Sequence, residues 1–278
     1  MNTLAGKTAI ITGASAGIGE MVAHKFIEEG ANVVLIARNM GPLDKLKAQF
    51  DAGRAAVYAM DVTDYAGFTR VIKEAKARWG SMDFLINNAG AHNRGDVAVV
   101  DPEKLARMVQ VNLEAPIVLT GMVLKIFKEQ RSGMIINIAS LAGRAPVDGA
   151  ATYSSTKFGL RAFSYALAEE LRQSYPNIKC CLVSPGPVIT GFILEEINEV
   201  EDIVFSQRPV GPDEVAKKVI RTAKDSKMER ITGGALSGIM SHVGYLFPRV
   251  KRAFKPLLTA KGKRVRESIK RQAGKTMP

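Results

Sequence analysis

Tyr153 and Lys157 are four residues apart in a segment whose apolar residues have helical spacing, so their side chains would share one face of a helix. The unperturbed pKa of a phenol, about 10, is too high for easy proton transfer at neutral pH. The positive charge of a neighbouring lysine favours phenolate, and we expect it to lower the pKa of Tyr153. The pair could then donate a proton to a developing alkoxide. In isolation, a buried aromatic residue beside a solvated lysine is the simpler interpretation.

A glycine-rich stretch near the N-terminus is a second candidate site. Its glycines have the spacing G-x-x-x-G-x-G between a short apolar run and a helical pattern, and they let the backbone approach a pyrophosphate without a Cβ in the way. The helix N-terminus would offer N–H groups and the positive end of its dipole to the phosphates. The alternative is a glycine-rich turn without a ligand. The predicted dinucleotide contacts are Gly13, Ser15, Ala16, Gly17, Ile18 and Gly19.

Arg38 follows the next apolar run, at the position where an NAD site usually has an acidic residue for the ribose hydroxyls. A guanidinium can pair with a 2′-phosphate through two hydrogen bonds and stack on adenine. We therefore expect NADP(H) rather than NAD(H) as the cofactor. The alternative is a solvated surface arginine.

The elements that must position these residues alternate along the chain. Apolar, strand-like runs occur at 7–12, 32–37, 55–60, 84–87, 134–139 and 178–183, and helical patterns at 17–30, 42–50, 64–79, 102–130, 152–175 and 212–226. Runs that are apolar on both faces suggest strands covered by helices on both sides. This alternation predicts an α/β fold with a single doubly wound, Rossmann-type parallel sheet. A last strand is expected near 230–234, so we place a catalytic domain at 1–235 and a basic helical extension at 236–278.

The composition of the 278 residues is that of an ordinary globular protein, with 46% hydrophobic residues, and this excludes disordered and fibrous classes. The net charge of +12 is concentrated at the C-terminal end, because Ser241–Pro278 contains 11 Lys and Arg residues against one acid, Glu267. Cys180 and Cys181 are adjacent, would point to opposite faces of a strand, and suit a reducing compartment. The sequence has neither a signal-peptide layout nor an uninterrupted apolar run of spanning length, and 115–127 is better explained as a core helix.

From residue 7 to 190, ordered motifs resemble those of the short-chain dehydrogenase/reductase family. Besides the glycine loop, they include Asp61-Val62, Asn88-Ala89-Gly90 after Asn87, Asn112 in Val111-Asn112-Leu113, Ser140, the Tyr153-x-x-x-Lys157 element, and Pro185-Gly186 followed by Val188 and Thr190. A single motif of this kind occurs by chance, but the whole ordered set does not. The resemblance implies hydride transfer between a nicotinamide cofactor and a carbonyl or alcohol.

The resemblance also assigns roles to individual residues. Asn112, Ser140, Tyr153 and Lys157 would form the catalytic group. Tyr153 would be the acid, Ser140 would donate a hydrogen bond to the substrate oxygen, and Asn112 would hold a water that links Lys157 to solvent.

Cofactor roles follow from the same resemblance. Asp61 and Val62 would contact adenine, and Lys157 would also bind the nicotinamide ribose. The remaining cofactor contacts would be Asn88, Ala89, Gly90, Tyr153, Pro185, Gly186, Val188 and Thr190.

Histidines are a weaker source of function. His24, His92 and His242 are scattered and lack metal-ligand spacing, so no metal site is predicted. His92 follows the Asn-Asn-Ala-Gly turn and could lie at the mouth of the active site, but the acid role already belongs to Tyr153.

The C-terminal segment bears on the substrate and the location. Relatives have a mobile lid between Thr190 and Pro209, and its apolar residues here suggest an apolar substrate, although an amphipathic surface helix would have the same pattern. Alternating apolar and basic residues over 243–271 are typical of a helix lying on an anionic membrane, a layout that loosely resembles membrane-associated lipid-carbonyl reductases. Packing on the lid or on another subunit is an equal alternative, and residues 261–278 could be disordered. Nucleic acid is disfavoured because stacking aromatics are few.

Our leading hypothesis is an NADPH-dependent reductase of an apolar, lipid-like ketone or aldehyde. The alternatives are an alcohol dehydrogenase for a steroid- or retinol-like substrate and an NADP(H)-binding scaffold or sensor without turnover. We expect a homo-oligomer, a dimer or tetramer that could pair through 152–175, in the cytoplasm or on the inner face of a membrane.

Overall fold

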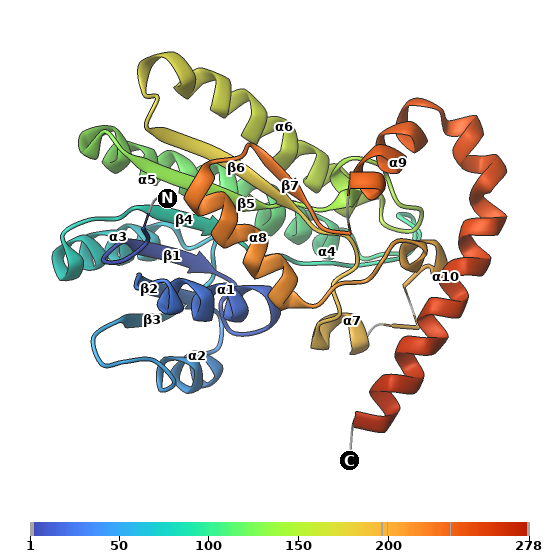
Figure 1. Ribbon diagram of the computed structural model, residues 1–278, viewed down its shortest axis with the longest axis horizontal. Coiled ribbons are helices and arrows are strands. Elements are labelled where there is room, and N and C mark those ends of the chain that lie inside the picture. Colours follow the sequence, from blue (N-terminus) through green and yellow to red (C-terminus); the bar gives the residue numbers. More distant parts are fainter. Residues whose placement is uncertain (1–2, 196, 199, 234, 277–278) are drawn as a thin grey trace.

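The computed structural model describes residues 3–195, 197–198, 200–233 and 235–276 (Figure 1). One parallel sheet has the strand order β3-β2-β1-β4-β5-β6-β7. The strands are β1 (Thr8–Thr12), β2 (Asn32–Ala37), β3 (Ala55–Ala59), β4 (Phe84–Asn87), β5 (Gly133–Ile138), β6 (Ile178–Ser184) and β7 (Glu229–Ile231). This order, which reverses direction between β1 and β4, confirms the predicted doubly wound sheet. The last strand is shorter than the predicted 230–234, and Gly234 lies outside the described residues.

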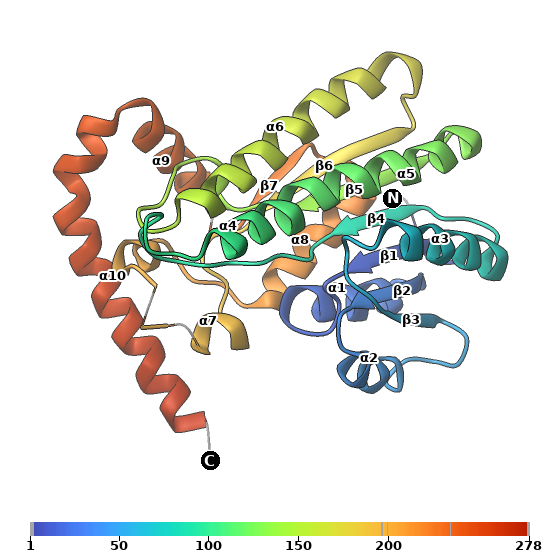
Figure 2. The ribbon, with the colours of Figure 1, turned by 180° about the vertical axis from the view of Figure 1, so that it is seen from behind.

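Helices cover both faces of the sheet (Figures 1 and 2). One face carries α1 (Gly17–Glu28), α2 (Met40–Lys47) and α8 (Pro212–Asp225), and the other carries α3 (Tyr65–Trp79), α5 (Ala115–Gln130) and α6 (Ala151–Ser174). Strand residues alternate between the two cores: Val33 packs in one and Val34 in the other. The same alternation places Cys180 and Cys181 on opposite faces of the sheet, as predicted, and both thiols are buried.

The predicted single helix at 102–130 is wrong in its middle. The structure has α4 (Pro102–Val109), a π-helical segment at Gln110–Glu114, and then α5. Pro116 has no N–H to donate to the carbonyl of Asn112, so a regular α-helical ladder cannot run through this point. The π-helical turn therefore places Asn112 at the interruption.

The stretch Pro102–Gln130 is long and apolar enough to cross a membrane by length and composition alone, and 39% of its most apolar window is buried. Within α5, Leu119, Val123 and Phe127 pack in the core beneath the sheet. This agrees with the prediction of a core helix at 115–127.

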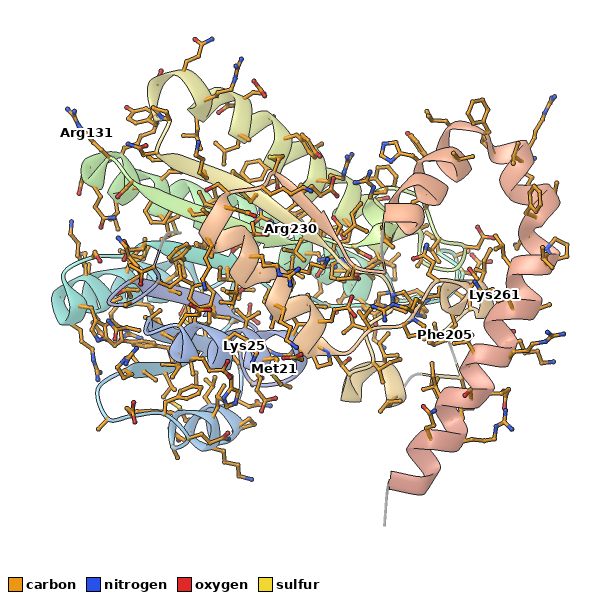
Figure 3. The ribbon with its side chains drawn as sticks, viewed as in Figure 1. Met21, Lys25, Arg131, Phe205, Arg230 and Lys261 are labelled. Carbon is orange, nitrogen blue, oxygen red and sulfur yellow. The ribbon has the colours of Figure 1, made fainter. Side chains whose placement is uncertain are left out.

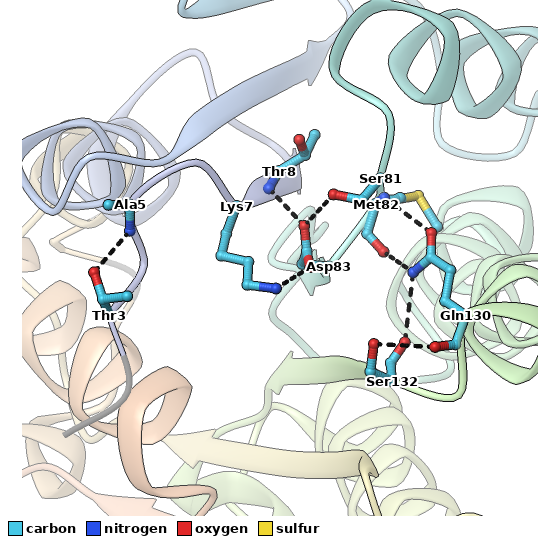
Figure 4. Close-up of polar contacts among 9 residues, drawn as sticks. All are labelled: Thr3, Ala5, Lys7, Thr8, Ser81, Met82, Asp83, Gln130 and Ser132. Atoms are coloured by element: carbon cyan, nitrogen blue, oxygen red, sulfur yellow. Dashed lines mark hydrogen bonds and ion pairs between the residues drawn. The ribbon is translucent and has the colours of Figure 1, made fainter.

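At the amino ends of the strands, Asp83 joins the start of β1 to the start of β4 (Figure 4). Its carboxylate accepts hydrogen bonds from the backbone N–H of Thr8 (2.9 Å), from Lys7 Nζ (2.8 Å) and from Ser81 Oγ (2.8 Å). This network fixes the register of the two central strands at the edge opposite the candidate site.

The C-terminal part adds a second helical layer beyond the carboxyl edge of the sheet. It contains α7 (Gly191–Glu195), a 3-10 turn η3 (Asp202–Ser206), α9 (Ala235–Leu246) and α10 (Pro248–Thr276). Both ribbon views place α9 and α10 to one side of the sheet, with α10 running past η3 (Figures 1 and 2). Residues 261–276 are therefore helical, contrary to the alternative of disorder, and Pro248 begins α10 while Pro256 lies inside it.

Candidate active site

The predicted cofactor segments and Ser140 lie along one edge of the sheet, because each follows the carboxyl end of a parallel strand, whereas Asn112 lies in the π-helical segment and Tyr153 and Lys157 lie on α6. The glycine loop follows β1, Arg38 follows β2, Asp61 and Val62 follow β3, Asn88–Gly90 follow β4, Ser140 follows β5, and Pro185–Thr190 follow β6. The sheet thus brings together residues that are up to 177 positions apart in the chain, from Gly13 to Thr190.

The glycine loop fits a pyrophosphate. Helix α1 begins after Ala16, whose side chain makes no capping hydrogen bond, so the first N–H groups of the helix have no side-chain acceptor there. A Cβ on Gly19 would lie 2.2 Å from the carbonyl oxygen of Gly13 and 2.6 Å from Asn88 Nδ2, so only glycine fits. Asn88 in turn donates to the carbonyls of Thr12 (2.9 Å) and Gly13 (3.1 Å), which fixes the loop against β4.

Arg38, Asp61 and Val62, the residues predicted to bind the adenosine end of the cofactor, are not among those that line the main cavity. Arg38 is exposed just beyond β2, and Val62 is buried. Asp61 forms an ion pair with Arg107 and accepts two hydrogen bonds from Thr63 (2.7 and 2.9 Å). Burial alone would raise the pKa of Asp61, but the bonds from Arg107 and Thr63 outweigh it and lower this pKa to about 2. Both carboxylate oxygens therefore have protein partners, which the sequence did not indicate.

Tyr153 and Ser140 line the same cavity, and Ser140 acts on the pKa of the Tyr153 phenol. Burial raises the pKa of Tyr153, and the opposing effects of Ser140 and the Arg94 charge are smaller. The expected net lowering of this pKa is therefore wrong for this structure, because burial outweighs the favourable charges. The physical reason is that burial removes water from the phenolate, while the lysine Nζ lies 5.7 Å from the ring centroid.

Lys157 is 5% exposed, and its Nζ donates a hydrogen bond to the carbonyl of Ile138 at 3.0 Å. Burial lowers the pKa of Lys157 to about 8. This contact holds the ammonium group between the end of β5 and the tyrosine, at the wall of the cavity.

Asn112 is fully buried behind the cavity. Its Oδ1 accepts from the N–H of Ala91 (2.7 Å), and its Nδ2 donates to the carbonyl of Ala91 (2.8 Å) and to Thr156 Oγ1 (3.3 Å). Asn112 therefore connects the π-helical segment, the loop after β4 and helix α6. Its expected role in holding a water stays a prediction.

Three of the four predicted catalytic residues, Ser140, Tyr153 and Lys157, line a cavity of about 700 Å³, and Asn112 does not. Its outer wall comes from the segments after β6, with Ile193, Ile203 and Val204, and from α10, with Leu258 and Lys261. Predicted site residues that line it are Ile18, Asn88, Gly90, Ser140, Tyr153, Lys157, Pro185, Gly186, Val188 and Thr190. On its lid side, the cavity therefore combines these apolar residues with the polar side chains of Ser206, Gln207 and Arg208.

Several residues of the site escaped the sequence interpretation. Leu258 and Lys261 could not be placed, because only the tertiary fold brings α10 to the lid. Arg94 lines the cavity as well. His92 does so too, in agreement with its expected place at the mouth, and its ring centroid lies 4.4 Å from that of Tyr153.

Burial, with the charges of Arg94 and Lys157, lowers the pKa of His92 to about 3, so its imidazole is neutral at pH 7. No group of three or more His, Cys, Asp or Glu residues that could hold a metal ion occurs within the described ranges.

Comparisons with known proteins agree with this architecture. Residues 7–201 match the short chain dehydrogenase family. An uncharacterized oxidoreductase of Staphylococcus saprophyticus is 32% identical over 79% of the chain and 90% of its own length, and the ketoacyl reductase HetN of Nostoc is 31% identical over 89% and 88%.

Solved structures are similar as well. A metagenomic short-chain oxidoreductase, crystallised with NADP, has a TM-score of 0.70 at 31% identity, covering 83% of this chain and 98% of its own. A short-chain dehydrogenase from Streptomyces avermitilis has a TM-score of 0.75 at 26% identity, covering 90% and 95%. The chain therefore belongs to the short-chain dehydrogenase family of oxidoreductases.

Proposed function

We propose that this protein is an NADP(H)-dependent carbonyl reductase that converts an apolar, lipid-like ketone to an alcohol. The observation that carries the proposal is the cavity of about 700 Å³, whose wall contains Tyr153 and Ser140 as well as apolar side chains of the lid region and Leu258 of α10. A carbonyl can meet the two hydroxyls while an apolar chain extends toward the lid.

NADP(H) fits the residues along the carboxyl edge. The uncapped N-terminus of α1 and the close packing at Gly19 suit the pyrophosphate, and the exposed Arg38 suits a 2′-phosphate. The metagenomic relative solved with NADP supports this choice, and the relative named ketoacyl reductase supports carbonyl reduction. Asn88, Ala89, Gly90, Pro185, Gly186, Val188 and Thr190 would hold the nicotinamide half, and Asp61 and Val62 the adenine.

When bound, NADPH supplies the hydride. Ser140 accepts a hydrogen bond from the N–H of Ala142 at 3.1 Å, which leaves its own proton for the substrate oxygen or for Tyr153. Tyr153 keeps its proton at neutral pH because burial raises its pKa, so it can protonate the alkoxide oxygen. The Lys157 charge stabilises the phenolate that remains.

Asn112 supports this group from behind. By holding both the N–H and the carbonyl of Ala91, it fixes the loop that carries His92 against Tyr153. The neutral imidazole of His92 packs on the phenol ring and adds no charge that would compete with Lys157.

The proposal extends to assembly and location. We infer a homo-oligomer that pairs through α6, as in many relatives, and a cytoplasmic enzyme in peripheral contact with the inner face of a membrane. A lipid-like substrate would explain that contact, because such a ketone partitions into the bilayer.

The test is turnover of a series of methyl ketones of increasing chain length, followed by oxidation of NADPH. Each methylene that enters an apolar wall contributes about 0.8 kcal/mol, so kcat/KM should rise by up to about fourfold per methylene until the cavity is filled. Ser140→Ala should lower turnover throughout the series. NADPH binding without turnover of any carbonyl would instead support the non-catalytic alternative, and a flat dependence on length would contradict the apolar substrate.

A further inference from the structure

Helix α10 carries one apolar stripe that has two different environments. Toward its C-terminal end, Val265 and Ile269 pack against the buried Val200 and Phe205 of the lid region. The two segments are in close contact, because a Cβ on Gly262 would lie 1.7 Å from the carbonyl oxygen of Asp202. Figure 3 labels Phe205 and Lys261 where η3 and α10 lie side by side. This half of the predicted membrane segment 243–271 is therefore a lid contact.

The other half of the stripe is exposed. At the turn from α9 into α10, six large apolar side chains are 44% to 68% exposed, and they make up half of the exposed large hydrophobic residues found among the described positions. A contiguous group of this kind on a protein surface marks an interaction site rather than a solvated face. We name this group the corner patch: Tyr245, Leu246, Phe247, Val250, Phe254 and Leu257.

The charge around the corner patch selects the kind of partner. Arg249 and Arg252 are exposed between its members, and from Ser241 to Pro278 the sequence has 11 basic residues against Glu267 as the one acid. Within the described part of the chain, three of these 11 residues form ion pairs in the protein: Lys255 with Asp148, Arg266 with Asp202 and Lys270 with Glu267. Two copies of so basic a surface would repel each other, whereas anionic lipid headgroups would attract it.

The apolar side chains separate a membrane from other anionic partners. A nucleic acid would neutralise the arginines but leave the aliphatic and phenylalanine side chains in water. A bilayer accepts both, because the aromatic and aliphatic groups enter the boundary of headgroups and acyl chains while the arginines stay at phosphate level.

The corner patch also borders the substrate cavity. Ser241 and Gly244 of α9 and Leu258 and Lys261 of α10 line the cavity, and the corner patch lies between these two pairs in the chain. The rim of the cavity and the exposed apolar surface are therefore continuous along the two helices.

We propose that the corner patch docks this protein on an anionic membrane and orients the cavity entrance toward the bilayer, so that a ketone enters from the lipid phase. The docking surface stands on its own observations, whereas delivery of a ketone rests on the proposed reductase activity.

The experiment is flotation of the full-length protein with vesicles of phosphatidylcholine alone or with about a third of phosphatidylglycerol. Wild type should bind the anionic vesicles, and binding should weaken as salt is raised. The double variant Phe247→Ser/Phe254→Ser should bind them at least about tenfold more weakly, because two inserted rings are removed. A matched control is Val99→Ser. It removes an apolar side chain that is 82% exposed and far from α9 and α10 in the chain, and this variant should bind the vesicles as wild type does.

Turnover separates docking from activity. With a short, water-soluble ketone the double variant should match wild type, whereas with a long-chain ketone presented in anionic vesicles it should fall behind by about the loss in binding. Absence of wild-type flotation, or equal flotation of the double variant, would overturn the docking proposal even if the enzyme reduces ketones. A change of oligomeric state in the double variant without a change in flotation would assign the corner patch to a subunit contact and would also overturn it.

Discussion

The carboxyl edge of the sheet and the C-terminal helices contribute to function by different physical means. At the sheet edge, hydrogen bonds to single backbone atoms fix the positions of side chains. Asn112 makes two such bonds with Ala91, and Lys157 makes one with Ile138. In α9 and α10, the proposed contribution comes from an extended apolar surface. The side chains of the corner patch do not belong to any of the three hydrophobic core clusters.

This difference separates reaction type from substrate choice. The chemistry depends on positions fixed by strand ends, so a replacement there should have a large effect. The choice and delivery of substrate depend on summed apolar area, so replacements there should have graded effects. The next three predictions are arranged from the largest expected effect to the smallest.

Arg38→Ala tests the cofactor end of the sheet edge. A hydrogen bond to a charged group contributes about 1.5–3 kcal/mol, so the preference for NADPH over NADH should fall by about tenfold to a hundredfold. The measurement is the dissociation constant of each nucleotide from intrinsic fluorescence. Arg70→Ala, which removes an exposed arginine from α3, is the control and should keep the preference. An unchanged preference in Arg38→Ala would mean that Arg38 is only a solvated residue.

Gly262→Val tests the contact between α10 and the lid. Its Cβ would collide with the carbonyl of Asp202, so α10 must move away from η3 and the apolar wall of the cavity opens. We expect kcat/KM for a long-chain ketone to fall by about tenfold, with little change for a short one. Gly121→Ala, on an exposed helical position with nothing within 4 Å of the new Cβ, is the matched control. Equal losses for both ketones would indicate a general loss of stability.

The pH dependence of turnover tests the role of the Lys157 charge, and its expected effect is smaller. Because its pKa is lowered to about 8, its positive charge is present below that pH and lost above it. Turnover at saturating substrate should halve near pH 8 and fall further as pH rises. Tyr153 cannot cause this decline, because its pKa is raised and its proton is retained. Constant turnover up to pH 10 would contradict a role for the lysine charge.

The sheet and many of the residues that line the cavity could be predicted because strand ends and short motifs are local signals. Apolar runs predicted the strands, and parallel strands align their carboxyl ends, so Ser140 had to lie at the same edge as the glycine loop. The π-helical turn was missed because periodicity alone extends through 102–130, although Pro116 is the local sign of the interruption.

Long-range contacts set the limit of prediction. The apolar residues of α10 have the same helical spacing where they pack on Phe205 and where they are exposed. The sequence therefore could not distinguish the packed part of this stripe from the exposed part. The direction of the Tyr153 pKa also depended on tertiary burial, because the helical spacing that joins it to Lys157 says nothing about how much water reaches the phenol.

The central claim, that Tyr153 donates the proton, is tested most directly by turnover of Tyr153→Phe with an accepted ketone and saturating NADPH. The control is Tyr165→Phe, which removes a hydroxyl from the same helix. The Tyr165 hydroxyl donates a hydrogen bond to Glu229 at 2.9 Å, and Tyr165 does not line the cavity. The account predicts that Tyr153→Phe binds NADPH normally and loses about a thousandfold in kcat, while Tyr165→Phe stays close to wild type. Full turnover by Tyr153→Phe would contradict the account.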